Sequence, residues 1–273
     1  MTGSRIVVVS PHLDDAVLSL GATIAAATRA GQDVSVLTVF AGEPDSAAEP
    51  SSWDVRAGFR SAGEAGRARR AEDAAACATL GARAVCLEGV RTLSRAELGR
   101  RLRPELAQAD LVLIPGYPCT HADHELVSAL VLEDGVPGEL ALYVEQPYAM
   151  WRLLGQQHAR RRRIARSVGL AARAGGVRAL QEPVVPAALR RAASTAGWEP
   201  IRATAHDRWL KQRASLCYRS QFRLFGLRLL AAIALYEWAF GGEAIGRLTA
   251  TTDAGRAGSG SVPPAETRRV KTP

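Results

Sequence analysis

An apolar run that leads straight into a polar turn constrains the fold of this chain more than any other feature. Residues 5–9 read Arg-Ile-Val-Val-Val, which is typical of a buried strand, and residues 10–15 read Ser-Pro-His-Leu-Asp-Asp. A helical pattern follows from about residue 14 to residue 30 and ends at Gly31, and residues 34–40 have the pattern of a second strand. This order of strand, loop, helix and strand predicts the start of a parallel α/β sheet.

The same alternation continues to about residue 145. It predicts three more helices and three more strands: helices over residues 67–80, 98–108 (with Ser94 as N-cap) and 123–132, and strands over residues 84–87, 111–114 and 141–145. Residues 41–66 are expected to form a long loop, and residues 206–240 to be helical. We therefore predict a Rossmann-like α/β fold with a mostly parallel, doubly wound sheet flanked by helices. A single domain is expected over residues 1–252, followed by a disordered tail over residues 253–273.

Composition narrows the class of protein. The chain has 273 residues, of which 47% are hydrophobic and 23% charged, so it can bury a sizeable core. Its longest clean apolar run, residues 229–236, is far shorter than the roughly 20 residues of a membrane helix. We also expect no signal peptide. Four scattered cysteines without a CxxC pair fit a reducing, cytoplasmic setting.

The first motif with chemical meaning follows the first predicted strand. In open α/β sheets, ligands bind outside the carboxyl ends of strands. If a helical turn starts here, His12 and Asp15 lie on one side of it and offer an imidazole and a carboxylate to a zinc ion. Asp14 lies between them, where a carboxylate would suit a general base acting on water at the metal. An ordinary N-cap aspartate pair is the simpler interpretation of this motif by itself.

A second motif follows the fourth predicted strand and has the same character. Its residues are His121, Ala122, Asp123 and His124, so two imidazoles stand three residues apart with a carboxylate between them. Strands one and four are neighbours at the switch point of a doubly wound sheet, and the two motifs are therefore predicted to meet over one metal ion. Spacing alone does not decide which of the two histidines is a ligand.

Together these motifs resemble the PIG-L family, also called LmbE-like, of zinc-dependent N-acetylglucosaminyl deacetylases and related amide hydrolases. The resemblance covers roughly residues 5–240. Beyond the Pro-His-Leu-Asp-Asp and His-Ala-Asp-His motifs, it rests on residues 69–72 with Leu80 and Gly81, on residues 143–149, and on Lys211 with residues 218–221. One departure is Ala16, where many family members have Glu after the aspartate pair. We expect this change to alter the surroundings of the site without abolishing zinc binding.

The resemblance implies a role for each motif residue. Three would bind a single Zn²⁺ ion, or another divalent metal, namely His12, Asp15 and His124. Asp14 would be the general base, and His121 would stabilise the oxyanion or protonate the leaving amine. Asp123 would orient a neighbouring imidazole, and Arg69 would hold substrate hydroxyls.

These roles predict a zinc-dependent N-deacetylase. Its substrate would be a small N-acylated amino sugar or glycoconjugate, including one carried on a bacterial natural product. The alternative enzyme is an amidase that cleaves a cysteine or thiol conjugate. A nucleotide- or nucleic-acid-binding protein is the alternative of another class, since the net charge is +8. However, no Gly-rich phosphate loop follows the first strand and no basic motif is interleaved with aromatics, so we expect no nucleic-acid partner.

The other histidines, one cysteine, the arginine run and the apolar C-terminal stretch have simpler explanations. Cys119 is expected to line a loop or pocket wall, because a catalytic zinc keeps one position open and needs only three protein ligands. His158 and His206 are expected to be ordinary histidines, and the arginine run of residues 160–163 a solvated helix face. The apolar stretch of residues 224–240 is expected to be core or the interface of a homo-oligomer.

Overall fold

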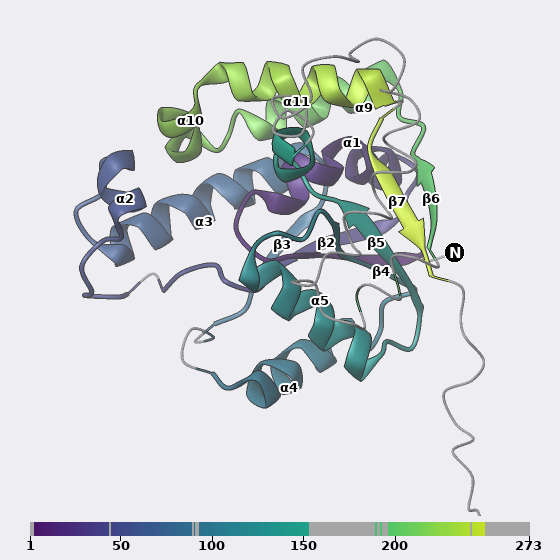
Figure 1. Ribbon diagram of the computed structural model, residues 1–273, viewed down its shortest axis with the longest axis horizontal. Helices are drawn as coiled ribbons and strands as arrows, with labels where there is room; N and C mark the ends of the chain where they lie inside the picture. The colour runs from purple at the N-terminus through teal and green to yellow at the C-terminus, as the bar shows by residue number, and fades with distance from the viewer. Residues whose placement is uncertain are drawn as a thin grey trace, which may run out of the picture.

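A seven-stranded sheet lies at the centre of the computed structural model (Figure 1). The structure describes residues 3–43, 45–88, 90, 93–152, 189, 192, 196–240 and 242–248. The strands are β1 (Arg5–Ser10), β2 (Asp33–Thr38), β3 (Arg83–Cys86), β4 (Leu111–Tyr117), β5 (Glu139–Val144), β6 (Gly197–Pro200) and β7 (Ala244–Arg247), in the spatial order β3-β2-β1-β4-β5-β7-β6. The first five in this order are parallel to one another, whereas β7 is antiparallel to both of its neighbours. The predicted mostly parallel α/β fold is confirmed.

Helices cover both faces of the sheet (Figure 1). The helices on one face are α1 (Asp15–Arg29), α3 (Ala62–Thr79) and α9 (Ala205–Ser215), and those on the other are α4 (Arg95–Leu106) and α5 (Ala122–Asp134). Each face buries its own apolar cluster, because successive side chains of a strand point to opposite sides of the sheet. In β1, Val8 packs toward α1 while Val7 and Val9 pack toward α4 and α5. The remaining described helices, α2 (Ser52–Ala57), α10 (Arg219–Phe225) and α11 (Leu227–Phe240), lie outside these layers.

The switch point of the sheet lies between β1 and β4. From β1 the chain winds outward through β2 and β3 on one side, and through β4 and β5 on the other. Ile6 pairs with Leu111 in parallel register, so β1 and β4 end on the same edge of the sheet. The predicted neighbourhood of the first and fourth strands is therefore confirmed, and the two motifs follow strands that end side by side.

Three regions differ from the sequence-based prediction. The predicted loop of residues 41–66 contains α2, which begins with a capping box at Ser51, and the first turn of α3, capped by Ser61. The stretch of residues 206–240 is helical as predicted, but it is divided into three helices, with a break at Gly226, whose φ is positive. Strands β6 and β7 were not predicted, because their sequences, Gly-Trp-Glu-Pro and Ala-Ile-Gly-Arg, contain no run of apolar residues.

Some of the predicted features lie outside the described residues. These are the arginine run of residues 160–163, His158 and the tail over residues 253–273. Among the helices that the structure describes, none combines the length and the apolar character needed to cross a bilayer.

A buried ion cluster holds α1 in place. The helix is kinked at Leu20, just before the backbone N–H groups of Ala22 and Thr23. The carboxylate of Glu243 accepts both, at 2.9 and 2.7 Å. Lys211, which is 1% exposed, lies 2.6 Å from Glu243 and also contacts Glu237. The cluster therefore ties α9 and the start of β7 to the helix that carries the first motif.

Replacing Lys211 by Met should destabilise the protein strongly. The substitution leaves two buried carboxylates without their cation, and breaking a buried pair in this way costs about 3–5 kcal/mol. Arg95→Met is the matched control, because Arg95 pairs with Glu133 at 2.7 Å on the surface, where such pairs contribute about 0–1 kcal/mol. Urea unfolding followed by circular dichroism measures both variants, and equal losses in the two would contradict the prediction.

Candidate metal centre and active site

The turn after β1 is fixed by its own hydrogen bonds. The hydroxyl of Ser10 donates to the carbonyl of His12 at 2.6 Å and accepts the backbone N–H of Ala16 at 3.0 Å. The backbone N–H of His12 donates to Asp15 Oδ2 at 2.9 Å. These bonds wrap the motif around the first turn of α1, which brings the His12 ring and the Asp15 carboxylate to one side.

The second motif forms the first turn of α5. His121 is the N-cap residue, and its Nδ1 accepts the backbone N–H of Asp123 at 3.2 Å. When the imidazole is neutral, this bond leaves the ring proton on Nε2. The side chain of His121 is 46% exposed, whereas that of His124 is completely buried. Thus His121 faces the open side of the site and His124 faces its interior.

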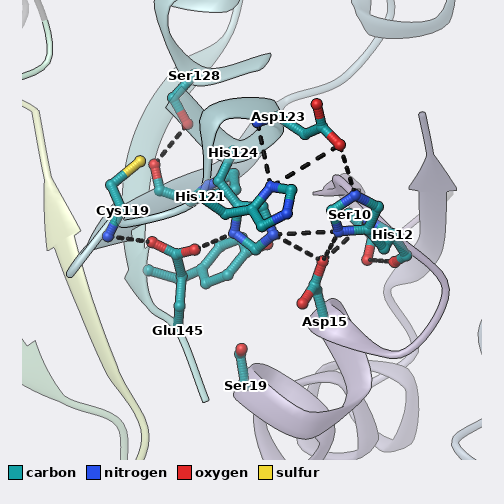
Figure 2. Close-up of polar contacts among 12 residues, drawn as sticks. Ser10, His12, Asp15, Ser19, Cys119, His121, Asp123, His124, Ser128 and Glu145 are labelled. Carbon is teal, nitrogen blue, oxygen red and sulfur yellow. Dashed lines mark hydrogen bonds and ion pairs between the residues drawn. The ribbon is translucent and has the colours of Figure 1, made fainter. Parts of the chain in front are cut away.

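Three ligand-type atoms from the two motifs converge on one point. His12 Nδ1 lies 3.2 Å from Asp15 Oδ2, His124 Nε2 lies 3.2 Å from the same oxygen, and the two nitrogens are 3.2 Å apart. Figure 2 shows these nitrogens turned toward one another and toward the carboxylate. We call His12, Asp15 and His124 the triad.

The triad fits a small divalent cation. Donor atoms at about 2.0–2.1 Å from a tetrahedral Zn²⁺ ion are separated by about 3.4 Å, close to the 3.2 Å between each pair here. Two imidazoles and one carboxylate are also a donor set that zinc and related metals accept. His121 widens the choice, because one ring nitrogen from each of His12, His121 and His124 can be chosen so that all three lie within 4.8 Å of one another. The triad is the tighter set.

Two further carboxylates contact the triad imidazoles, each at the ring nitrogen that does not belong to the triad. Asp123 Oδ2 lies 2.8 Å from His12 Nε2, and Glu145 Oε2 contacts His124 Nδ1. The other oxygen of Glu145 accepts the backbone N–H of Cys119 at 2.8 Å (Figure 2). A carboxylate on the far nitrogen of a ligand imidazole fixes the tautomer, so that the near nitrogen keeps its lone pair.

Glu145 was not among the site residues predicted from the sequence. It directly follows β5 and is 1% exposed. The signal that could have found it is its position, since an acidic residue at the carboxyl end of a buried strand beside β4 is rarely buried without a partner. Cys119 is buried in the loop after β4 and is not one of the converging atoms.

The charges of the site favour charged imidazoles in the absence of a metal. Burial alone would lower the pKa of His12, but hydrogen bonds with Asp123 and Asp15 outweigh it and raise the value to about 9. His124 behaves in the same way, because burial is outweighed by Asp15 and Glu145, and its pKa rises to about 11. The site thus offers a cation-binding environment in which a metal ion would replace two protons.

Asp14 lies beside the triad but does not belong to it. Its side chain makes no capping hydrogen bond with α1. Burial and the neighbouring charge of Asp15 raise the pKa of Asp14 well above its ordinary value. A carboxylate with a raised pKa next to a ligand set is suited to accept a proton near neutral pH.

Arg69 approaches the same region from α3. Its Nη2 lies 2.8 Å from Asp54 Oδ1 of α2, and its guanidinium lies over the ring of Phe59, 5.6 Å from the centroid. The charge of Arg69 also acts on the carboxyl group of Asp14. Arg69 is therefore near the site, and it anchors the α2 segment there.

Replacing Glu145 by Gln should weaken metal binding by about 10–100-fold, because the amide no longer supplies the charge that orients His124. Competition with a chromophoric chelator measures the affinity. Glu133→Gln is the control, since Glu133 is 52% exposed on the same α5 that carries His124. Equal affinities of the Glu145 and Glu133 variants would show that Glu145 only fills space.

Comparisons with known proteins agree with this picture. The family model described as PIG-L, GlcNAc-PI de-N-acetylase, matches residues 7–133, a segment that contains both motifs. No curated protein matches the chain.

Solved structures with the same fold include those of two deacetylases, one of them in two forms. A triple mutant of the deacetylase of the teicoplanin biosynthetic pathway is 22% identical with a TM-score of 0.67, covering 92% of this chain and 100% of its own. The deacetylase of the A40926 pseudoaglycone is 24% identical with a TM-score of 0.64, covering 90% and 96%. A zinc-inhibited form of the teicoplanin deacetylase is 20% identical with a TM-score of 0.65, covering 92% and 100%. At these identities the likeness establishes the fold.

Proposed function

Because the PIG-L family model matches residues 7–133 of this chain, we propose that the protein is a metal-dependent N-deacetylase. The observation that carries the proposal is the triad, in which two imidazole nitrogens and one carboxylate oxygen lie 3.2 Å from one another. The proposed substrate is an N-acylated amino sugar, and the antibiotic deacetylases among the structural neighbours favour a sugar carried on a glycosylated natural product. The proposed metal is Zn²⁺, and the proposed setting is the cytoplasm, which the four unpaired cysteines fit.

In this proposal His12, Asp15 and His124 hold the metal. When bound, a divalent metal supplies a Lewis acid and lowers the pKa of a water molecule from 15.7 to about 7. Asp14 accepts the proton of the attacking water at its carboxylate, which its raised pKa suits. Asp123 holds the ring of His12, and Glu145 that of His124, so neither imidazole can turn away.

His121 acts on the opposite side of the reacting amide. Burial and the neighbouring His12 and His124 lower its pKa, so the ring is neutral at pH 7 and carries its proton on Nε2. From that atom it donates to the oxyanion that forms at the amide carbonyl. The proton held by Asp14 then passes to the leaving amine, and acetate and a free amino sugar are released. Arg69 stands near Asp14, where it can donate to a substrate hydroxyl.

A panel of acetylated compounds tests the substrate class. Purified protein is first analysed for metal content, stripped with a chelator, and then titrated with Zn²⁺, Fe²⁺ or Co²⁺ from below to above one equivalent. The titration is needed because one structural neighbour is described as zinc inhibited. Acetate release is measured with N-acetylglucosamine, N,N′-diacetylchitobiose, an N-acetylglucosaminyl glycopeptide and N-acetylcysteine conjugates.

We expect metal-dependent release from the sugars. Release only from the thiol conjugates would favour the amidase alternative. Salt-sensitive binding to random DNA by a protein that takes up no metal would favour the nucleic-acid alternative.

A further inference from the structure

An aromatic side chain lies against the metal centre on the side of His124. The half-buried ring of Tyr148 meets the ring of His124 edge-on, with the centroids 5.2 Å apart and the planes at 81°. Tyr148 comes three residues after Glu145, the carboxylate that contacts His124 Nδ1. One short segment therefore supplies both the charged partner of His124 and an apolar wall beside it.

Trp151 extends this wall outward. Its ring meets that of Tyr148 edge-on, with the centroids 5.7 Å apart and the planes at 87°, and Trp151 is 39% exposed. Residues 148–152 are helical, and side chains three residues apart lie on one side of a helix. Trp151 is thus two ring contacts away from a triad residue, which is within reach of a sugar ring whose amide lies at the triad.

The turn that carries both rings is anchored in the core. The backbone N–H of Ala149 donates to the carbonyl of Glu145, and that of Trp151 to the carbonyl of Pro147, both at 2.9 Å. Ala149 and Met150 are buried, and Met150 packs in an apolar cluster with Leu18, Leu229, Leu230 and Ile233. Because these two buried residues occupy the core side of the turn, the aromatic rings on either side of them in the sequence are held on its opposite side.

The chemistry of the two rings suits a sugar better than an acyl chain. A pyranose ring has apolar C–H faces and polar hydroxyl edges, and Tyr and Trp likewise combine an apolar ring with an O–H or N–H at its edge. Burial and the carboxylates of Asp15 and Asp14 hold the pKa of Tyr148 well above its ordinary value, so its hydroxyl stays protonated and can donate. An acyl chain would cover that hydroxyl without giving it a partner, which costs free energy.

We propose that Trp151, seated on Tyr148, binds the apolar face of the substrate's sugar ring and so selects amino sugars over other amides. The inference rests on the proposed function, in which the triad holds the metal at which the amide reacts. Trp151 is then a specificity-determining residue. Its ring contacts the sugar equally in the ground state and the transition state, so it lowers KM without changing kcat.

Kinetics of the metal-loaded enzyme test this role. With the methyl glycoside of N-acetylglucosamine, Trp151→Ala should lower kcat/KM about 10-fold, almost entirely through KM, and Trp151→Phe should recover part of the loss because it keeps an aromatic face. Trp209→Ala is the matched control. Trp209 is 50% exposed on α9, where the nearby Asp207 pairs with Arg29 at the opposite end of α1 from the triad. An unchanged KM in Trp151→Ala would overturn the proposal.

A binding experiment separates the sugar from the acyl group. The indole N–H resonance of Trp151, identified by its loss in Trp151→Ala, is followed in metal-loaded Asp14→Asn protein. The methyl glycoside of N-acetylglucosamine should shift it, whereas N-hexanoylethanolamine, which has a longer acyl chain and no sugar, should not. The resonance of Trp209 should stay in place with both ligands. A shift of the Trp151 resonance with N-hexanoylethanolamine alone would assign the wall to the acyl chain and overturn the proposal.

The outcomes distinguish this inference from the proposed function. If acetylated sugars are hydrolysed but Trp151→Ala behaves like Trp209→Ala, the role of Trp151 is wrong and the proposed function stands. If no acetylated sugar is hydrolysed at any metal loading, the proposed function is wrong. The indole resonance then still shows whether Trp151 binds a sugar ring, and an unmoved resonance overturns the inference as well.

Discussion

An Asp14→Asn variant is expected to lose about 1,000-fold or more in kcat while it still folds and binds metal. The amide has the size of the carboxylate but cannot accept the proton of the attacking water. The N-terminus of α1 should be preserved, because the side chain of Asp14 makes no capping bond that the substitution would remove. Acetate release from metal-loaded protein, with metal content and melting temperature measured in parallel, tests this expectation.

Asp33→Asn is the matched control for this variant. Asp33 is an exposed carboxylate at the first residue of β2, at the opposite end of the sheet from the site. It should keep full activity. Undiminished turnover in a folded, metal-loaded Asp14→Asn protein would refute the assigned base, whereas loss of metal from that protein would mean that Asp14 is a ligand.

The second large effect, a loss of metal affinity, is expected when a residue of the triad is replaced. Replacing His124 by Ala should reduce metal affinity by at least about 1,000-fold, more than the 10–100-fold expected for a group outside the ligand set. Activity should disappear with the metal. Because His124 is buried and paired with Glu145, its removal also leaves an unpaired buried charge that can destabilise the fold.

Asp15→Asn provides an independent test of the same site. It changes one ligand atom at constant size. We expect this variant to lose metal as the His124 variant does, and to unfold in a cooperative transition, which shows that it is folded. His206→Ala is the histidine control, since His206 is exposed on α9 and stacks on Trp209 away from the triad. Metal analysis after gel filtration measures all three proteins. A His124 or Asp15 variant that retains one equivalent of metal would exclude the triad and favour a set that uses His121.

The core of the fold followed from patterns that are local in the chain. The β-branched run of β1, the stop at Gly31 and the cap at Ser94 each act within a few residues, so they can be recognised in the sequence. Parallel strands joined by helices allow few topologies, and the neighbourhood of β1 and β4 followed from that restriction. Three short elements escaped the same reasoning, because β6 and β7 contain glycine and no run of apolar residues, and α2 lies in a polar segment rich in Ser, Pro and Gly.

In the candidate site, too, local sequence patterns predicted one part and missed another. The sequence by itself determined that an imidazole and two carboxylates follow one central strand, and that two imidazoles and a carboxylate follow its neighbour. Only the tertiary structure decided which atoms converge, that Glu145 supports His124, and that Tyr218 is hydrogen-bonded to Asp73. The physical reason is distance along the chain. Tyr218 meets Asp73 across 145 residues, and no local pattern records a contact that exists only after the sheet and its helices have packed.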